Sequence, residues 1–163
     1  MPSNPSPSLI TLAFELHMLI FSDLAPKELL TLGQTCKELH EVMSDRAVWE
    51  AALRSVCREY SLFEPSFPFK SMDVPHLQRA TFGPTLWQRR LAKAAAQEVP
   101  LVPSETEVRL KDQEERSYIR LMRIPGNRYF IASTKWNIEL WDLGVPYAKG
   151  PKPNPTLVAE DDL

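Results

Sequence analysis

Apolar residues between positions 9 and 60 recur every three or four residues, with polar residues between them. This spacing is typical of amphipathic helices that bury one face. We predict four short helices here: about 14–21, from near Pro26 to near Gly33, about 35–43, and from Arg46 to about Tyr60.

Several of these helices carry end signals. Pro26 suits a first turn, because proline lacks the N–H group that would have no partner there. Gly33 can end the second helix with a positive φ. Ser44 and Asp45 offer a cap for the fourth helix.

The first and fourth helices differ in how their apolar residues are arranged. The fourth has one stripe: Trp49, Ala52, Leu53, Val56 and Tyr60. The first has two stripes roughly half a turn apart: Leu12, Leu16, Leu19 and Ile20, and Phe14, Met18 and Phe21. A small helical unit has one core, so the second stripe needs another surface. Either the Phe- and Pro-rich segment after Tyr60 folds back over it, or another protein covers it.

Beyond residue 60 the pattern changes. Residues 61–98 mix Phe and Pro and then return to helical spacing. We expect a short helix at about 74–81, a break at Gly83-Pro84, and a longer helix from Thr85 to about Ala96. These helices either link two parts of the chain or belong to one helical domain with the first four. Residues 99–116 are polar and acidic, which indicates a linker.

Residues 117–143 have strand character. Three β-prone runs, at 118–124, 128–133 and 138–143, are joined by Pro125-Gly126-Asn127 and Lys135-Trp136-Asn137. Proline at the second position of a turn and glycine at the third favour a tight turn. We therefore predict a small antiparallel β-meander, and α+β as the fold class. The proline-containing ends, residues 1–8 and 144–163, are predicted to be a disordered leader and tail.

Composition narrows the class of function. The 163 residues include 19 basic and 21 acidic side chains, a net charge of −2. This gives no electrostatic case for nucleic acid or anionic lipid as the main partner, and no segment approaches the roughly 18 unbroken apolar residues of a membrane span. Two cysteines, Cys36 and Cys57, exclude a disulfide-framed scaffold. We expect a reducing compartment, the cytoplasm or the nucleus.

Candidate catalytic residues are scattered. His17, His40 and His76 lie far apart, and Cys36 with His40 supplies only two potential metal ligands. No glycine-rich phosphate loop is present in the sequence. We predict a protein that is not an enzyme and that uses no cofactor and no metal.

One ordered set of residues resembles a known family. The set is Leu12-Ala13-Phe14-Glu15-Leu16, Ile20-Phe21-Ser22-Asp23-Leu24, Glu28-Leu29-Leu30, Cys36-Lys37, and Ser44-Asp45 with Trp49. Its order and spacing resemble the F-box. The sequence departs from the family pattern at Ala13, where the family has proline. Ala25 also stands where Asp or Ser would cap the second helix better, by about 1 kcal/mol.

The resemblance implies a short-helix bundle that docks on the small adaptor subunit of a cullin–RING ubiquitin ligase, while a separate C-terminal part holds an unknown substrate protein. The docking role carries over to Leu12, Phe14, Leu16, Ile20, Phe21, Leu24, Pro26 and Leu29. We expect Trp49 to lie in the core instead. The alternative is an F-box-like scaffold that works outside a ubiquitin ligase, which the change at Ala13 favours.

The predicted meander ends in Trp141-Asp142 and resembles the opening of a WD-type β-propeller blade. In fungal F-box proteins a propeller-like domain commonly follows the F-box. A propeller needs at least four blades of four strands, so we expect one incomplete blade, from a truncated or degenerate propeller.

Overall fold

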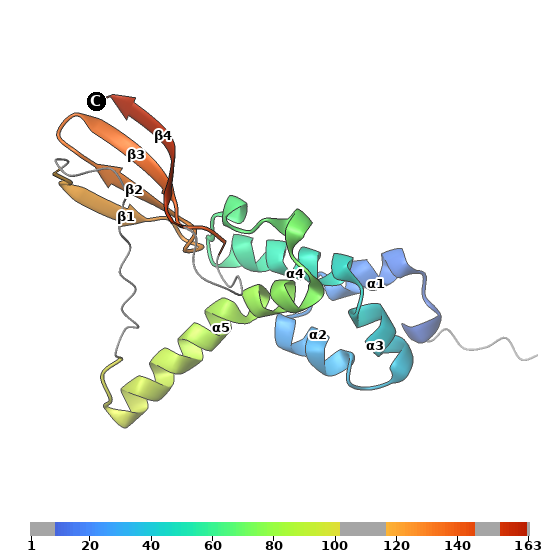
Figure 1. Cartoon of the computed structure of the whole chain (residues 1–163). Coiled ribbons are helices and arrows are strands. Elements are labelled where there is room, and N and C mark those ends of the chain that lie inside the picture. Colours follow the sequence, from blue (N-terminus) through green and yellow to red (C-terminus); the bar gives the residue numbers. More distant parts are fainter. Residues whose placement is uncertain (1–8, 102–116, 146–153, 163) are drawn as a thin grey trace, which may run out of the picture. The chain divides into compact units, whose positions relative to one another are not determined.

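The computed structural model describes residues 9–101, 117–145 and 154–162. Helices come first along the chain and a four-stranded antiparallel sheet follows (Figure 1). The fold class is therefore α+β, as predicted. The α-helices are α1 Phe14–Phe21, α2 Pro26–Leu32, α3 Lys37–Met43, α4 Arg46–Glu59 and α5 Val74–Gln97. The strands are β1 Arg120–Arg123, β2 Tyr129–Ser133, β3 Asn137–Asp142 and β4 Thr156–Asp162, and the short 3-10 helices are η1 Leu9–Thr11, η2 Glu64–Ser66 and η3 Phe69–Ser71.

The chain forms two compact units. One, the helical unit, comprises Met1–Val56 and Asp73–Phe82, and the other, the sheet unit, comprises Cys57–Met72 and Gly83–Leu163. The predicted leader and most of the predicted polar linker, residues 1–8 and 102–116, lie outside the described residues. None of the described helices is both long enough and apolar enough to cross a membrane.

Trp49 lies at the centre of the first unit. Its side chain is fully buried, and its indole Nε1–H donates a 2.7 Å hydrogen bond to the Met43 carbonyl at the end of α3. Its ring lies 6.2 Å from that of Phe82 on α5. The prediction that Trp49 is a core residue is confirmed. Leu29, Val48, Leu53 and Leu77 are buried in the same unit.

Gly33 follows α2, but not in the predicted conformation. Its φ is −66°, in the right-handed region, so the predicted positive φ is wrong. The reason for glycine here is space: a Cβ atom at this position would lie 3.0 Å from both Cβ and Cγ of Met43. Gly33 therefore lets the end of α2 approach α3.

The break predicted at Gly83-Pro84 is also wrong, because α5 runs through both residues. The proline ring removes the hydrogen bond that residue 84 would donate to the Ala80 carbonyl, but its φ is compatible with a helix. The turns on either side keep their own hydrogen bonds, so one missing donor does not end this helix.

The sheet has the strand order β1-β2-β3-β4, and neighbouring strands are antiparallel. The predicted turn between the first two strands is confirmed: Gly126 has φ +112°, and the Asn127 N–H donates a 3.2 Å hydrogen bond to the Ile124 carbonyl. The predicted disordered tail is wrong at residues 156–162, which form β4 beside β3. The edge of β3 that faces away from β2 supplies the hydrogen-bond partners that make this segment a strand.

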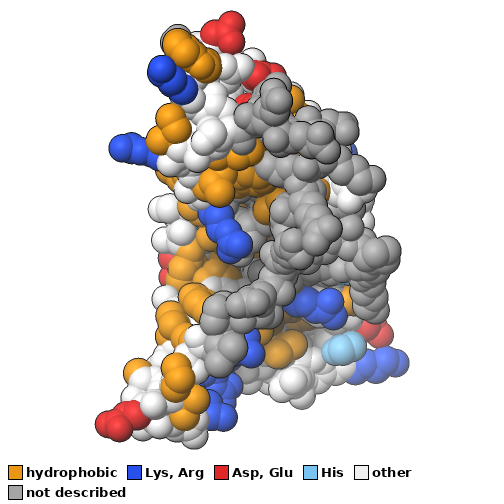
Figure 2. Space-filling model, turned by 60° about the vertical axis from the view of Figure 1, so that its left-hand side comes forward, with side chains coloured by type: hydrophobic (Ala, Val, Ile, Leu, Met, Phe, Trp, Pro, Cys, Tyr) orange, Lys and Arg blue, Asp and Glu red, His pale blue; other side chains and the backbone are white. Residues whose placement is uncertain are grey.

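One face of the sheet is apolar and buried: Phe130 and Trp141 stack with ring centroids 6.2 Å apart, beside the buried Ala132. The buried Glu139 lies on this face too, and its Oε2 accepts hydrogen bonds from Tyr118 Oη and Trp141 Nε1. Elsewhere, hydrophobic side chains (orange) reach the surface beside Lys and Arg side chains (blue), as Figure 2 shows for one face of the molecule.

The segment after Tyr60 packs on the β1–β2 turn. The Phe63 N–H donates a 2.9 Å hydrogen bond to the Pro125 carbonyl, and the Phe63 ring meets that of Tyr129 edge to face at 6.0 Å. A Cβ atom on Gly126 would lie 2.5 Å from Ser66 Oγ. Residues 57–72 thus belong to the same unit as the sheet. Of these, residues 61–72 fall in the segment that we predicted to be a linker.

Candidate functional site

Helix α1 exposes apolar side chains on one side. Leu16, Leu19 and Ile20 are exposed on this side, and Leu19 keeps 66% of its surface in water. We call these three residues the α1 patch. Phe14, in the first turn, is exposed too, but it lies on a different side of the helix. Ile10 before α1 and Leu30 on α2 are exposed as well. Exposed apolar residues gathered on one short helix mark an interaction surface.

The opposite side of α1 faces the core. Phe21 is buried, with 4% of its surface exposed, and Met18 is half-buried. The prediction of two stripes is therefore confirmed, with one stripe inward and the other outward. Phe14, at the first turn, is the exception: it shares a stripe with Met18 and Phe21 but is exposed.

His17 is an inward residue that sequence reasoning missed. It is buried, its ring stacks on Phe21 at 5.4 Å, and its Nε2 lies 2.7 Å from the Leu9 carbonyl oxygen. A carbonyl only accepts hydrogen bonds, so Nε2 carries the proton. His17 thereby ties η1 to α1. The one sequence signal was its spacing, four residues before Phe21.

The eight residues predicted to dock divide into three groups. Phe14, Leu16 and Ile20 are exposed, whereas Leu12, Leu24 and Pro26 are half-buried. Phe21 and Leu29 are core residues, with 4% and 1% of their surface exposed. These two support the surface from inside and do not form part of it. Leu19, the most exposed residue of the α1 patch, was absent from the predicted set.

The two alanines that depart from the family pattern both precede helices. Ala13 has φ −63° and ψ 151°, and its carbonyl accepts the first α1 hydrogen bonds from Leu16 and His17. Ala25 lacks a side-chain acceptor, but Glu28 Oε2 accepts a 2.8 Å hydrogen bond from the Ala25 N–H. Glu28 therefore makes one half of a capping box without the other.

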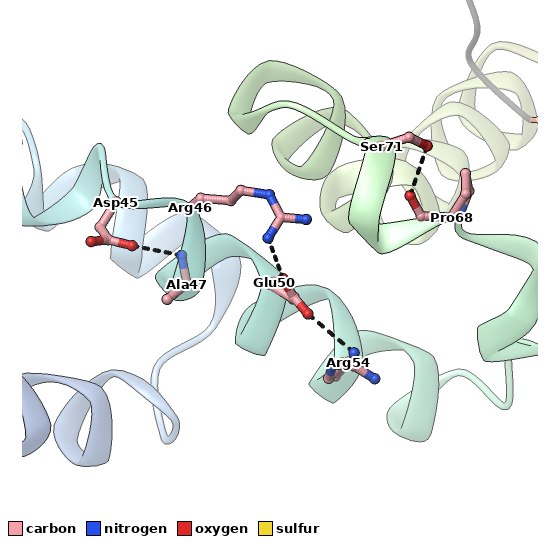
Figure 3. Close-up of polar contacts among 7 residues, drawn as sticks. All are labelled: Asp45, Arg46, Ala47, Glu50, Arg54, Pro68 and Ser71. Atoms are coloured by element: carbon pink, nitrogen blue, oxygen red, sulfur yellow. Dashed lines mark hydrogen bonds and ion pairs between the residues drawn. The ribbon is translucent and has the colours of Figure 1, made fainter.

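Polar contacts hold α4, which carries the buried Trp49. Asp45 Oδ1 accepts a 2.7 Å hydrogen bond from the Ala47 N–H and caps the helix, as predicted. Along the helix, Glu50 accepts from Arg46 at 2.7 Å and from Arg54 at 3.1 Å (Figure 3). These pairs are partly exposed and each contributes a few tenths of a kcal/mol.

The site offers apolar contact. Within the described ranges, no three His, Cys, Asp or Glu side chains form a group that could hold a metal ion. Cys36 and Cys57 do not form a disulfide bond. The α1 patch presents carbon surface on a helix whose other side is fixed in the core, an arrangement suited to binding another protein.

Comparison with known proteins agrees with this geometry. Residues 14–55 match the family model described as F-box-like. The match begins at the first residue of α1, contains the whole α1 patch, and ends within α4. No curated protein matches the chain. The chain therefore carries an F-box-like region, the part of the sequence that showed the resemblance.

Proposed function

We propose that this protein is a non-catalytic substrate receptor that docks on the small adaptor subunit of a cullin–RING ubiquitin ligase. The exposed α1 patch, which lies inside the F-box-like region, is the observation that carries the proposal. F-box regions are protein-interaction modules, and their usual partner is such an adaptor.

The energetics of the α1 patch suit docking. Burial of one leucine or isoleucine side chain stabilises a complex by about 1.5–3 kcal/mol. Leu16, Leu19 and Ile20 together can offset much of the entropy that association costs. Phe21 is buried in the core and His17 donates a hydrogen bond to the Leu9 carbonyl, so α1 is already held in place before the partner binds.

For the sheet unit we propose a role in holding the substrate protein. Its four antiparallel strands in sequential order, with Trp141-Asp142 at the end of β3, support a relationship to one propeller blade and to the fungal type of F-box protein. We also propose a cytoplasmic or nuclear protein, which the absence of a disulfide between Cys36 and Cys57 supports.

Copurification of the full chain with the adaptor tests the docking role. Leu19→Asp places a charge on the α1 patch, so we expect binding to weaken more than tenfold, since about 1.5–3 kcal/mol of apolar contact is lost. The matched control is Leu86→Asp on α5, another exposed helical leucine (55% against 66% for Leu19). Circular dichroism should show both variants folded. Undiminished binding by a Leu19→Asp, Ile20→Asp double variant would remove the assignment.

A second candidate function is an F-box-like scaffold outside any ligase, and Ala13 favours it. The backbone at Ala13 has the φ that proline requires, so this φ would accept the family residue in an Ala13→Pro variant. If the scaffold function holds, the natural chain fails to copurify with the adaptor. Copurification of the natural chain would exclude this candidate.

A further inference from the structure

The sheet has two exposed edges. β1 and β4 are its outer strands (Figure 1), and every residue of both strands is exposed. Large apolar side chains lie on each, with Leu121 68% exposed on β1 and Leu157 and Val158 exposed on β4. An exposed apolar edge is a template for another strand, because its outward backbone groups can extend the ladder.

The two edges carry opposite charge. β1 contains Arg120 and Arg123 and no acidic residue, whereas β4 ends in Glu160, Asp161 and Asp162 and contains no basic residue. Arg120, Arg123, Asp161 and Asp162 make no side-chain hydrogen bond or ion pair with the part of the chain that the structure describes. Their charges are thus available to a partner.

The strand register sets Arg120 and Asp161 at the same level. Arg120 is paired with Ser133, Ser133 with Ile138, and Ile138 with Asp161. Directly paired residues share a face of the sheet. A second copy that continued the sheet without a shift would therefore place its Asp161 opposite Arg120 of the first.

Pairing between identical edges is less favourable. Two β1 edges would bring arginines together, and two β4 edges would bring carboxylates together, and like charges on neighbouring strands destabilise a sheet. The edge of β1 therefore fits the edge of β4 better than it fits itself.

We propose that copies of this chain associate head to tail, with the β4 edge of one copy added beside the β1 edge of the next. The new strand pair is antiparallel and continues the sheet. Backbone hydrogen bonds and the apolar residues of both edges supply affinity, and the opposite charges select the pairing. This contact joins two different surfaces, so it does not close at a dimer and builds larger oligomers.

Sedimentation velocity on the full chain, over a range of concentrations, tests the proposal. We expect species larger than a dimer as concentration rises. Arg120→Glu with Arg123→Glu makes both edges acidic, and Asp161→Lys with Asp162→Lys makes both basic. Each double variant should associate at least about tenfold more weakly than the natural chain.

An equimolar mixture of the two double variants is the decisive experiment. Each contact between the two different variants joins an acidic edge to a basic one, so association should return. Its return also shows that both variants are folded. The charge-matched control, Arg89→Glu with Arg90→Glu on α5, should associate like the natural chain. A monomeric natural chain, unaffected double variants or a mixture that stays monomeric would each overturn the proposal.

Discussion

At the scale of single residues, two glycines are needed for different physical reasons. Gly126 has a φ of +112° and also lies against Ser66, so both its backbone and its lack of a side chain matter. Gly33 has an ordinary helical φ, and only the nearness of Met43 excludes a side chain. The turn motif Pro125-Gly126-Asn127 predicts the need for glycine at position 126 from the sequence alone. The need for Gly33 depends on a contact between α2 and α3, which the sequence does not show.

We predict that Gly33→Ala destabilises the protein. Helix propensity alone would make alanine better by about 0.5–1 kcal/mol, while overpacking against Met43 costs about 1–3 kcal/mol. From the middle of both ranges, the net effect is an unfolding free energy lower by about 1 kcal/mol, measurable by urea denaturation. A more stable variant would show that Met43 moves aside at little cost.

His17 illustrates the limit of sequence reasoning at this scale. The helix spacing placed it on α1 correctly, but a lone histidine among apolar residues does not reveal its partner. Its hydrogen-bond acceptor is the Leu9 carbonyl, and that position depends on how η1 turns back along α1.

At the scale of elements, Arg128 and Asp142 clasp the beginning of β2 to the end of β3. Arg128 donates from Nε and Nη2 to both Asp142 carboxylate oxygens at 2.7–3.1 Å, and the Gly144 N–H donates to Oδ1 at 2.8 Å. Partial burial by itself raises the pKa of Asp142, but the Arg128 and Gly144 hydrogen bonds and the Arg128 charge outweigh it. The pKa of Asp142 therefore lies below its ordinary value of 3.8.

This clasp predicts a pH dependence. A carboxyl group whose pKa is lower in the folded state stabilises the fold above its unfolded pKa, and this stabilisation is lost as the pH falls through the folded value. We expect Asp142→Asn to lower the unfolding free energy by about 1–3 kcal/mol at pH 7. The difference from the natural chain should shrink below pH 3.8, as urea denaturation at several pH values can measure. A difference that stays constant down to the lowest pH would contradict the clasp.

The helices α1 to α4 could be predicted from the sequence, whereas the strand β4 could not. α1 to α4 follow from apolar spacing and end signals, because each buries one face locally. β4 could not be predicted in the same way, since a segment that begins after prolines and ends in Glu160-Asp161-Asp162 has weak strand propensity of its own. Its register and its bulge at Leu140/Trp141 depend on β3.

At the scale of the whole molecule, the core of the helices and the outer strands of the sheet differ in their exposure to water. Trp49, Leu53 and Leu77 in the helical unit are fully buried, whereas both outer strands of the sheet are exposed at every residue. Local opening is easiest where few apolar contacts are lost and backbone hydrogen bonds face water.

We therefore predict that amide hydrogens exchange slowly in α4 and much faster in β4 when the protein is monomeric. At concentrations where copies associate, β4 should become protected, and the Asp161→Lys, Asp162→Lys variant should not. Mass spectrometry of exchanged peptides can follow both regions. Equal protection of α4 and β4 in a dilute, monomeric sample would show that the sheet is as stable as the helical unit.

The different exposure of the two cysteines makes local opening of the core measurable by thiol labelling. Cys57 is buried in α4, while Cys36, immediately before α3, is partly accessible. A thiol reagent can therefore modify Cys36 in the native state, but it reaches Cys57 only when α4 opens. The ratio of the Cys57 labelling rate to the Cys36 labelling rate therefore reports how often α4 opens. The same measurement can be made on the natural chain alone and in a complex.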